Sequence, residues 1–416
     1  MRDYDGWLKL AQDVLSDNRV TFRYTRPAPN TYEQQWLWDS CFHAIVLRHF
    51  DPQMARDELL SVVAHQFTDG PDAGMIPHMT YWRGGGRALW GRDDRSVITQ
   101  PPLVGVAAWL VYEKTGDAAL LQQLYEPLAR CHDWFERRRD PDGDNLVSLI
   151  HPWESGWDAS PRWDGPMGLG ADPTDDEARQ ARLELVEKLM ARGCDAAALA
   201  QDGLFHVEAA DFNAIRAADL ESLAKIAGAL GRTGDAAHWQ ARARAVQGAV
   251  QAKMARVGFV YDLAGPDEAP LAEQTAAAFV TLFGGCAAPD TAAALVEKLQ
   301  SPDWWPRYPV PTTPVSARSF RPDRYWRGNV WLNVNWLIWA GLRRCGHDSL
   351  AAALAERSLA LVEDSYALAR AQEQPDAEAA GGLYEYFNPL TADGRGSRPH
   401  SWSALVLDML AQPPAG

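Results

Sequence analysis

Three features of the sequence predict an all-helical fold. Segments such as residues 117–139 and 217–230 place apolar residues at helical spacing and are rich in Ala, Leu, Glu and Arg. Segments that alternate with the period of a strand are almost absent, and residues 310–320 are interrupted by proline. The third feature is a repeated pattern of helix starts, which also indicates how the helices are arranged.

Six acidic residues each follow a turn and open a segment rich in Ala or Leu. They are separated by 55 to 66 residues along the chain: Asp51, Asp117, Asp175, Asp235, Asp290 and Asp348. An acidic residue at a helix start accepts hydrogen bonds from free backbone N–H groups and complements the helix dipole. Each interval is long enough for two helices and their connections, so the spacing predicts roughly twelve helices in about six hairpins.

The even spacing favours a closed ring of six helical hairpins, an (α/α)6 barrel, and an open helical solenoid is the alternative. The long connections differ strongly from one another and contain most of the Trp, Gly and Pro residues. This pattern is typical of a barrel whose loops form a site at one end. Because no Ser/Gly-rich linker or change in composition divides the chain, we expect a single domain over residues 1–416.

The charge balance excludes several classes of partner. The chain has 40 Lys and Arg against 55 Asp and Glu, a net charge of −15, which repels phosphate backbones and anionic lipid headgroups. We therefore expect neither nucleic acid nor a membrane surface as a partner. There is no apolar run of membrane-spanning length, no signal-peptide core at the start, and no close pair among the five cysteines. These features predict a reduced, cytoplasmic protein, and they leave a homo-oligomeric assembly open.

The sequence predicts neither a metal site nor a cofactor. Its histidines are dispersed, and no His-x-x-x-His or Cys-x-x-Cys spacing appears, so a zinc site is not expected. Residues 140–150 carry acidic residues at the spacing of a calcium loop: Asp140, Asp142 and Asp144. The distal Glu of an EF-hand is missing, so we interpret this segment as a turn.

Four segments combine carboxylates, aromatic residues, Gly and Pro without helical periodicity: 31–44, 151–165, 323–337 and 381–396. The chain has 18 Trp, whose flat faces suit the C–H faces of sugars, although core packing is the alternative for any one of them. Hydrolysis of a glycosidic bond needs a carboxylic acid and a carboxylate. Asp158 and Glu385 suit these roles, because each lies among aromatic residues and Gly, where partial desolvation raises a carboxyl pKa. The alternatives are a loop brace for Asp158 and an ordinary surface carboxylate for Glu385.

The strings HPWESGWDASPRWD, YWRGNVWLNVNWL and EYFNPLTADGRG resemble glycoside hydrolase family 63. The resemblance is strongest to its bacterial branch of mannosylglycerate and glucosylglycerate hydrolases. It also includes QWLWDSCFHA, GMIPHM, TQPPL and RYPVPTTPVS, and it extends in order from about Tyr32 to Leu405. This resemblance implies an (α/α)6 barrel and hydrolysis with inversion at an α-linked sugar.

The resemblance also implies roles for individual residues. Asp158 matches the family's general acid and Glu385 its general base. A sugar-cradling segment is matched by Tyr32, Trp36, Trp38 and Asp39. Further substrate-binding candidates are Tyr81, Gln100, Trp157, Tyr325, Trp326 and Trp331. The chain departs from the family pattern at Ala159, where Asn is expected, and at Asn329, where Pro is expected, which leaves sugar and acceptor preference open.

A glycerate acceptor would require a nearby cation in this acidic protein. The resemblance places acceptor contacts near Arg216, and Arg83 lies in a Gly-rich stretch that could close as a lid. For both residues, a solvated surface arginine is the alternative.

The sequence therefore predicts an inverting hydrolase of a small α-glycoside, such as 2-O-α-glucosylglycerate or mannosylglycerate, with the two carboxyl groups about 6.5–9.5 Å apart. Other short α-glucosides, kojibiose-like or glucosylglycerol, are alternative substrates. A sugar 2-epimerase would instead need paired histidines in its pocket. A non-catalytic carbohydrate-binding protein is the remaining alternative.

Overall fold

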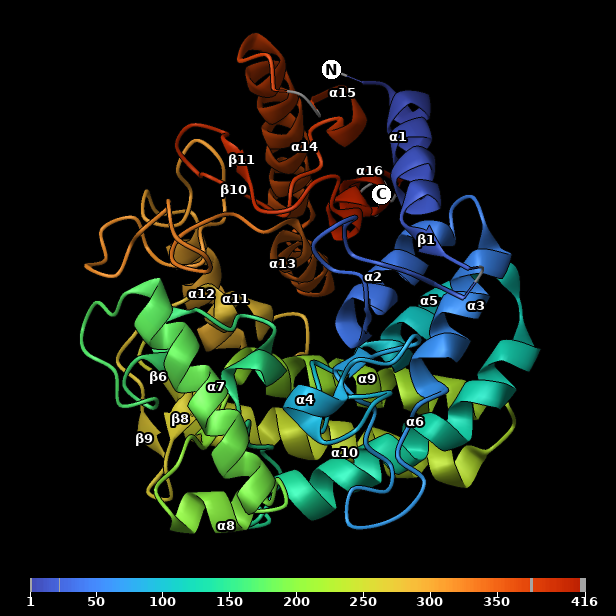
Figure 1. The fold of residues 1–416 in the computed structure, drawn as a ribbon, viewed down its shortest axis with the longest axis vertical. Helices are drawn as coiled ribbons and strands as arrows, with labels where there is room; N and C mark the ends of the chain where they lie inside the picture. Colours follow the sequence, from blue (N-terminus) through green and yellow to red (C-terminus); the bar gives the residue numbers. More distant parts are fainter. Residues whose placement is uncertain (1, 22, 375–376, 412–416) are drawn as a thin grey trace.

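The computed structural model describes residues 2–21, 23–374 and 377–411 (Figure 1). Six helical segments form a closed ring, in which each contacts the next and the last contacts the first. In ring order they are α2 (Leu37–Leu47), α5 (Val104–Thr115), α9 (Ala210–Ala229), α11 (Ala277–Val280), α13 (Leu332–Arg344) and the C-terminal pair η4 (Ser401–Leu405) and α16 (Val406–Ala411). The ring confirms the predicted (α/α)6 barrel over the described part of the chain.

A second layer of helices surrounds this ring. Five outer helices each pack against the ring helix that precedes them: α3 (Pro52–Val63), α6 (Ala118–Arg139), α10 (Thr233–Ala249), α12 (Pro289–Leu299) and α14 (Asp348–Ala371). The sixth outer helix is α1 (Tyr4–Asp17), which contacts η4 and α16. The two ends of the chain therefore complete the barrel together.

All six predicted acidic helix starts lie at helix N-termini. Asp51 and Asp117 are N-caps, and their carboxylates accept hydrogen bonds from the first turns of α3 and α6. The three later ones lie in the first turns of α10, α12 and α14. Asp175 instead opens α7 (Asp175–Ala191), which belongs to the connection between α6 and α9 and not to the ring. The expectation that it begins a barrel hairpin is wrong, because a capping motif specifies where a helix starts but not what it packs against.

The ring helices are apolar on most of their surface, as expected for helices enclosed by a second layer. Every residue of α2 is buried, and most of α9 and α13 is buried as well. One buried carboxylate in this core is well paired. Asp408 on α16 accepts hydrogen bonds from Arg48 and from Trp336 on α13, at 2.7 and 2.8 Å. These bonds fix the last ring helix to both of its neighbours.

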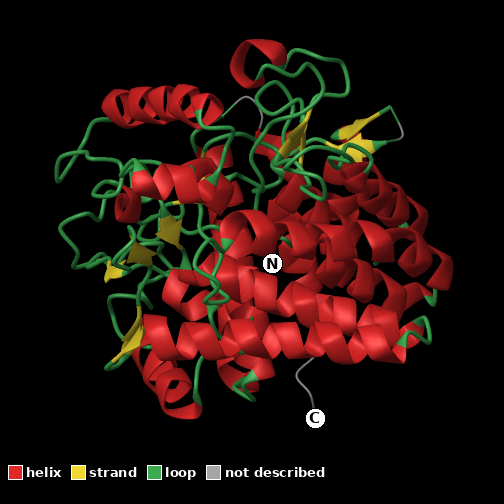
Figure 2. Cartoon of the chain, turned by 90° about the horizontal axis from the view of Figure 1, so that it is seen from below, coloured by secondary structure: helices red, strands yellow, loops and turns green. Residues whose placement is uncertain are grey.

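Strands are short and lie in the connections. The pairs are β1 (Arg19–Val20) with β2 (Tyr24–Thr25), β3 (Gln35–Trp36) with β4 (Met79–Thr80), β6 (Ala255–Arg256) with β7 (Phe259–Val260), and β10 (Tyr386–Phe387) with β11 (Gly394–Arg395). A three-stranded sheet is formed by β5 (Val207–Glu208), β8 (Leu263–Ala264) and β9 (Ala269–Pro270), in that order. Figure 2 shows loops gathered over one end of the helical barrel.

The remaining short helices also lie in these connections: α4 (Arg87–Trp90), η1 (Pro152–Ser155), η2 (Pro161–Trp163), α8 (Ala196–Gln201), η3 (Val250–Met254) and α15 (Ala377–Ala380). Among the described helices, none combines the length and apolar character needed to cross a bilayer.

The segment with calcium-loop spacing forms a turn, as expected. The carboxylate of Asp140 accepts hydrogen bonds from the backbone N–H groups of Asp144 and Asn145, at 3.0 and 3.1 Å. The turn contributes to an acidic cluster whose carboxylate oxygens all lie within 4.8 Å of one another: Asp142, Asp144, Glu208 and Glu268. The ammonium group of Lys253 bonds to Asp144 and Glu268 and supplies a counter-charge. Burial, together with the neighbouring carboxylates, raises the pKa of Glu208 to about 8.

Candidate active site

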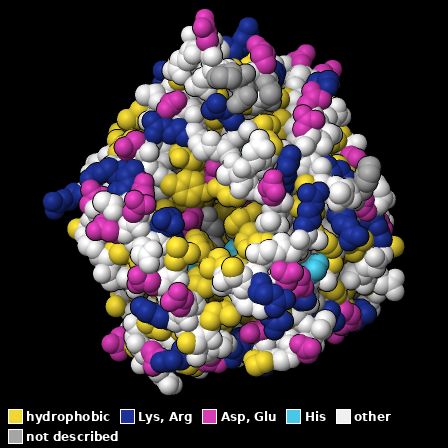
Figure 3. All heavy atoms as spheres, viewed as in Figure 1, with side chains coloured by type: hydrophobic (Ala, Val, Ile, Leu, Met, Phe, Trp, Pro, Cys, Tyr) yellow, Lys and Arg dark blue, Asp and Glu magenta, His cyan; other side chains and the backbone are white. Residues whose placement is uncertain are grey.

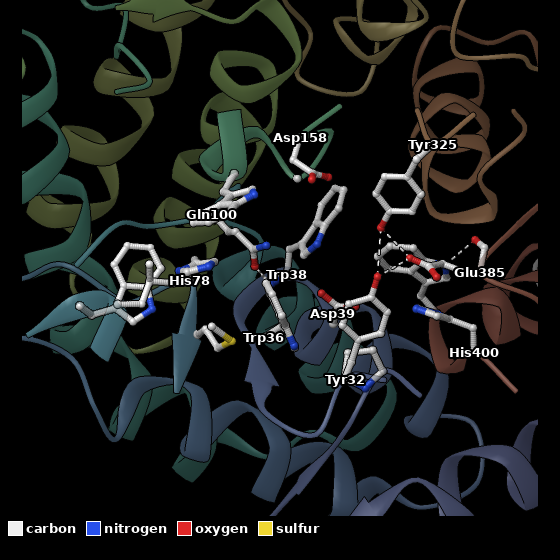
Figure 4. Close-up of a pocket in the computed structure, with 17 residues that line it drawn as sticks. Tyr32, Trp36, Trp38, Asp39, His78, Gln100, Asp158, Tyr325, Glu385 and His400 are labelled. Atoms are coloured by element: carbon white, nitrogen blue, oxygen red, sulfur yellow. Dashed lines mark hydrogen bonds between the residues drawn. The ribbon is translucent and has the colours of Figure 1, made fainter. Parts of the chain in front are cut away.

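A cavity of about 370 Å³ lies at the loop end of the barrel, and Figure 3 shows it as a hollow in the centre of this face. All four segments that the sequence analysis singled out reach it. Predicted site residues in its lining are Tyr32, Trp36, Trp38, Asp39, Gln100, Asp158, Tyr325 and Glu385. Figure 4 shows how these side chains converge on one space from different parts of the chain.

The first wall is formed where β3 runs into α2. Pairing of β3 with β4 fixes Trp36, and the next turn of chain places Trp38 and Asp39 at the N-terminus of α2. Burial raises the pKa of Asp39 well above its usual range. The loop that carries Asp158 approaches this wall closely at Gly156, where a Cβ atom would lie 2.4 Å from the Trp38 ring. With a φ of 76°, this position requires glycine.

Glu385 is held by four hydrogen bonds. The hydroxyl groups of Tyr32 and Tyr325 donate to its Oε1 atom at 2.8 and 2.6 Å. The backbone N–H and the hydroxyl of Ser397 donate to its Oε2 atom at 2.9 and 3.0 Å. Burial, together with the adjacent Glu385, raises the pKa of both tyrosines well above 10, so they remain protonated donors. The arrangement fixes the orientation of a carboxylate beside the cavity.

Asp158 reaches the same cavity from the loop that follows η1. Its side chain is half-buried, and Figure 4 shows its carboxyl group directed toward the space that Glu385 also borders. Burial raises the pKa of Asp158, and the negative charge of Glu385 raises it further, against the opposing effect of Arg182. A raised pKa favours the protonated form, which is the form that a general acid needs.

Two other charged residues of this loop, Glu154 and Arg162, have structural partners of their own, whereas Arg182 donates to the backbone oxygen of Asp158 at 3.2 Å. Glu154 is buried and accepts hydrogen bonds from Arg139 and from the backbone N–H of Ile150, both at 2.8 Å. Arg162 pairs with Asp211 and Asp262. The charge of Arg162 is thus balanced by Asp211 and Asp262, and these ion pairs hold the loop in place without using the carboxylate of Asp158.

Three predicted sugar-contacting residues do not line the cavity. Trp157, Trp326 and Trp331 are at most 1% exposed and stack on one another behind the cavity wall. Tyr81 is also absent from the lining, and its hydroxyl accepts a hydrogen bond from the indole of Trp90, which does line the cavity. Matching a residue to a family motif does not distinguish a side chain in the wall from one behind it, because both positions require aromatic residues.

Arg216 also requires a correction. It is 1% exposed on α9, and its guanidinium group donates to the backbone oxygen of Asn145 and to Glu136, at 3.2 and 3.3 Å. The structure therefore places it in the protein interior, where it ties α9 to α6 and to the turn after it, and not in the cavity. Arg83 does not line the cavity either.

Several cavity residues were missed by the sequence analysis. They are Pro27, His78, Met79, Leu89, Trp90, Trp153, Gly156, His400 and Trp402. The string GMIPHM contains two of them and could have pointed to them. Burial lowers the pKa of His78 to about 3 and that of His400 well below its usual range, so both imidazoles are neutral. In the described lining there are three carboxylates and no Lys or Arg.

This geometry provides the parts needed to hydrolyse a glycosidic bond. One carboxyl group has a raised pKa, another is a fixed carboxylate, and both face an aromatic-lined cavity large enough for a small glycoside. The family model described as "Mannosylglycerate hydrolase MGH1-like glycoside hydrolase domain" matches residues 32–403. The chain belongs to this family.

Named relatives align with nearly the whole length of this glycosidase. A mannosylglycerate hydrolase from Thermus thermophilus is 32% identical and covers 96% of this chain and 99% of its own. A glucosylglycerate hydrolase from Mycolicibacterium hassiacum is 31% identical and covers 93% and 94%. A crystal structure of the family 63 mannosylglycerate hydrolase from Thermus thermophilus, in complex with Tris, superimposes with a TM-score of 0.86 at 30% identity, covering 98% of this chain and 100% of the other.

These similarities confirm the resemblance to glycoside hydrolase family 63 and identify the chain as a glycosidase. The two alternatives from other functional classes, a sugar 2-epimerase and a non-catalytic carbohydrate-binding protein, are therefore not supported. His78 and His400 line the cavity, and both imidazoles are neutral.

Proposed function

We propose that this glycosidase hydrolyses a small α-glycoside with inversion, with Asp158 as general acid and Glu385 as general base. The observation that carries this proposal is that both carboxyl groups line one cavity. Burial raises the pKa of Asp158, and four hydrogen bonds hold the carboxyl group of Glu385 in a fixed orientation.

In this mechanism, the carboxyl group of Asp158 donates its proton to the glycosidic oxygen as the bond from that oxygen to the anomeric carbon breaks. A water molecule attacks the anomeric carbon from the opposite face, and Glu385 accepts a proton from that water. The products are a hexose of inverted anomeric configuration and the free alcohol of the acceptor. Room for the attacking water requires the two carboxyl groups to be about 6.5–9.5 Å apart.

The sugar is bound by the cavity wall at the N-terminus of α2. Trp36 and Trp38 offer indole faces to the sugar ring, and Asp39 and Gln100 offer hydrogen-bonding groups to its hydroxyls. Aromatic faces combined with a few directed polar groups are typical of sites for small polar ligands. The cavity volume of about 370 Å³ favours a compact substrate over an internal segment of a polymer.

The names of the relatives point to a glycoside of glycerate as the substrate, either the α-glucosyl or the α-mannosyl compound. A second candidate class is favoured by the charge of the cavity. Its described lining has three carboxylates and no Lys or Arg, and an anionic acceptor needs a cation or several donors for its carboxylate. Neutral acceptors, as in glucosylglycerol or kojibiose, avoid this requirement.

The experiment is a hexose-release assay on four substrates: glucosylglycerate, mannosylglycerate, glucosylglycerol and kojibiose. Asp158→Asn and Glu385→Gln should each lower kcat by more than about 10³-fold while the protein stays folded, because each removes one of the two proton-transfer groups. Wild-type activity in either variant would contradict the assignment. Release only from the two neutral substrates would favour the second class over the first.

Three further expectations from the sequence remain proposals. A single domain over residues 1–416 is supported by the packing of α1, near the start of the chain, on η4 and α16, which close the ring. A cytoplasmic location and a homo-oligomeric state remain predictions from the sequence alone.

A further inference from the structure

Four aromatic rings form a continuous stack behind the cavity. Trp157 stacks on Trp326 with ring centroids 5.2 Å apart and planes inclined by 12°. Trp326 stacks on Trp331 at 3.5 Å and 1°, and Trp331 stacks on Tyr386 at 4.8 Å and 23°. The three tryptophans are at most 1% exposed, so none of them is a sugar platform.

The stack is connected to the proposed catalytic groups through the backbone. Trp157 immediately precedes Asp158, and Tyr386 immediately follows Glu385. Trp326 immediately follows Tyr325, whose hydroxyl donates to Glu385. Three separate segments therefore each contribute a ring to the stack and the adjacent residue to the cavity, and the segment of Trp326 contributes Trp331 as a second ring. A shift of Trp157, Trp326 or Tyr386 would move the adjacent residue of the site, and a shift of Trp331 would disturb Tyr325, whose ring it contacts at 5.1 Å.

Both ends of the stack are anchored. The guanidinium group of Arg162 lies 4.9 Å from the Trp157 ring centroid and is itself held by buried Asp211 and Asp262. At the other end, Val330 and Phe387 form an antiparallel bridge, with backbone hydrogen bonds of 2.8 and 2.9 Å. This bridge sets the register between the residues next to them, Trp331 and Tyr386.

Trp326 also has an unusual backbone. Its φ of 60° is in the left-handed region, which bulky side chains rarely adopt. Such a conformation persists only where the surrounding structure imposes it, and it is found most often at functional sites. Here, stacking on both faces of the Trp326 ring supplies that constraint.

We infer that the stack of Trp157, Trp326, Trp331 and Tyr386 is a positioning element, which fixes the distance between Asp158 and Glu385 across the cavity. This inference rests on the proposed roles of the two carboxylates. An inverting enzyme depends on that distance, because a water molecule must fit between one carboxylate and the sugar. The rings act through the site residues next to them in the chain or in contact with them, and do not themselves line the cavity.

Trp331 is the residue to substitute, because it is central in the stack and its indole N–H has no hydrogen-bond partner. Replacing it with Phe therefore removes ring area but no hydrogen bond. We expect Trp331→Leu to lower kcat by about 10- to 100-fold with KM changed less than about threefold, since small displacements of reacting groups have effects of this size. Trp331→Phe, which keeps a stacking ring, should recover most of that loss.

The matched control is Trp304→Leu. Trp304 is equally buried, at 1% exposure, and packs against Phe259 and Phe279 outside the cavity lining. We expect Trp304→Leu to lose about as much thermal stability as Trp331→Leu, because both lose core packing. Its kcat should stay within about twofold of wild type. Equal effects of Trp331→Leu and Trp304→Leu on kcat at matched stability would overturn the inference.

A second readout separates positioning from general destabilisation. A loosened stack should admit water beside Asp158 and lower its pKa, so the basic limb of the kcat profile of Trp331→Leu should move to lower pH. If Trp331→Leu does not fold, Trp331→Met, which fills more of the space but offers no stacking ring, carries the test, and an unchanged kcat and pH profile in that variant would refute the inference. If Asp158→Asn and Glu385→Gln remain active, both the proposed function and this inference fail. If those two variants are inactive while Trp331→Leu behaves as wild type, only this inference fails.

Discussion

The hydroxyl of Tyr325 donates a hydrogen bond of 2.6 Å to Oε1 of Glu385, and the two residues come from separate loops 60 positions apart in the chain. Tyr32, from a third part of the chain, donates to the same oxygen. A carboxylate held in this way has one orientation toward the cavity. The orientation of the proposed base therefore depends on these two phenol groups.

Removing one of these phenols should reduce the rate more than the affinity. For Tyr325→Phe we expect kcat to fall by roughly 10- to 100-fold, since a hydrogen bond to a charged group contributes about 1.5–3 kcal/mol. The measurement is kcat and KM on the preferred substrate. Tyr366→Phe is the matched control, because Tyr366 donates to exposed Glu378 at 2.6 Å on the outer surface. Equal activity of both variants would show that the Tyr325 hydrogen bond has no role in catalysis.

The space beside Glu385 is also limited. A Cβ atom at Gly396 would lie 2.4 Å from Oε2 of Glu385, and the φ of 72° at this position adds backbone strain. Gly396→Ala should therefore displace the carboxylate and lower kcat by at least about tenfold. Gly231→Ala, at a φ of 74° with nothing within 4 Å, isolates the strain from the displacement. We expect Gly231→Ala to lose some thermal stability and to keep its activity; a similar loss of activity in both would contradict this explanation.

The pH dependence of catalysis follows from Asp158. Burial raises its pKa, and a general acid is active only while protonated. The kcat should therefore decrease as pH rises through this raised pKa, and the activity should persist above the range in which an ordinary Asp is protonated. If kcat already falls, with rising pH, within or below the range in which an ordinary Asp deprotonates, the titrating acid is not an Asp158 with a raised pKa. The measurement is kcat against pH with substrate at saturation.

The acidic cluster should make stability depend on pH. Glu208 has a pKa of about 8 in the folded protein and an ordinary value near 4.5 in the unfolded chain. The folded state thus binds the extra proton, and the free energy of unfolding contributed by this residue decreases as pH rises from about 4.5 to 8. Glu208→Gln removes this pH-dependent decrease in the free energy of unfolding. We expect its melting temperature to equal wild type near pH 5 and to exceed it above pH 8; a difference that is independent of pH would contradict the raised pKa.

Much of the fold was accessible from the sequence, because helix starts are encoded locally. The cap at Asp117 and the start at Asp348 are set by residues within one turn, and both were predicted. The role of the helix at Asp175 was not, because ring membership depends on long-range packing. The sequence also contains no local signal that α1 pairs with η4 and α16, at the other end of the chain.

The site could be predicted only in part for a similar reason. Asp158, Glu385 and the segment around Trp38 were located by motifs and do line the cavity. Trp331 and Arg216 were assigned to substrate binding, but one is in the stack and the other is in the interior. Aromatic and cationic residues serve in cores as well as in sites, and only the burial of the side chain distinguishes the two. His78 was missed because a single histidine in a loop has no spacing pattern.

The most direct test of the central claim is the configuration of the sugar at the moment of release. Proton NMR, started immediately after wild-type enzyme is mixed with the α-glycoside that it cleaves fastest, resolves the two anomers of the hexose before they equilibrate. Hydrolysis with Asp158 and Glu385 on opposite sides of the anomeric carbon predicts that the β-anomer appears first. Initial release of the α-anomer would mean a covalent or same-face route and would contradict the account.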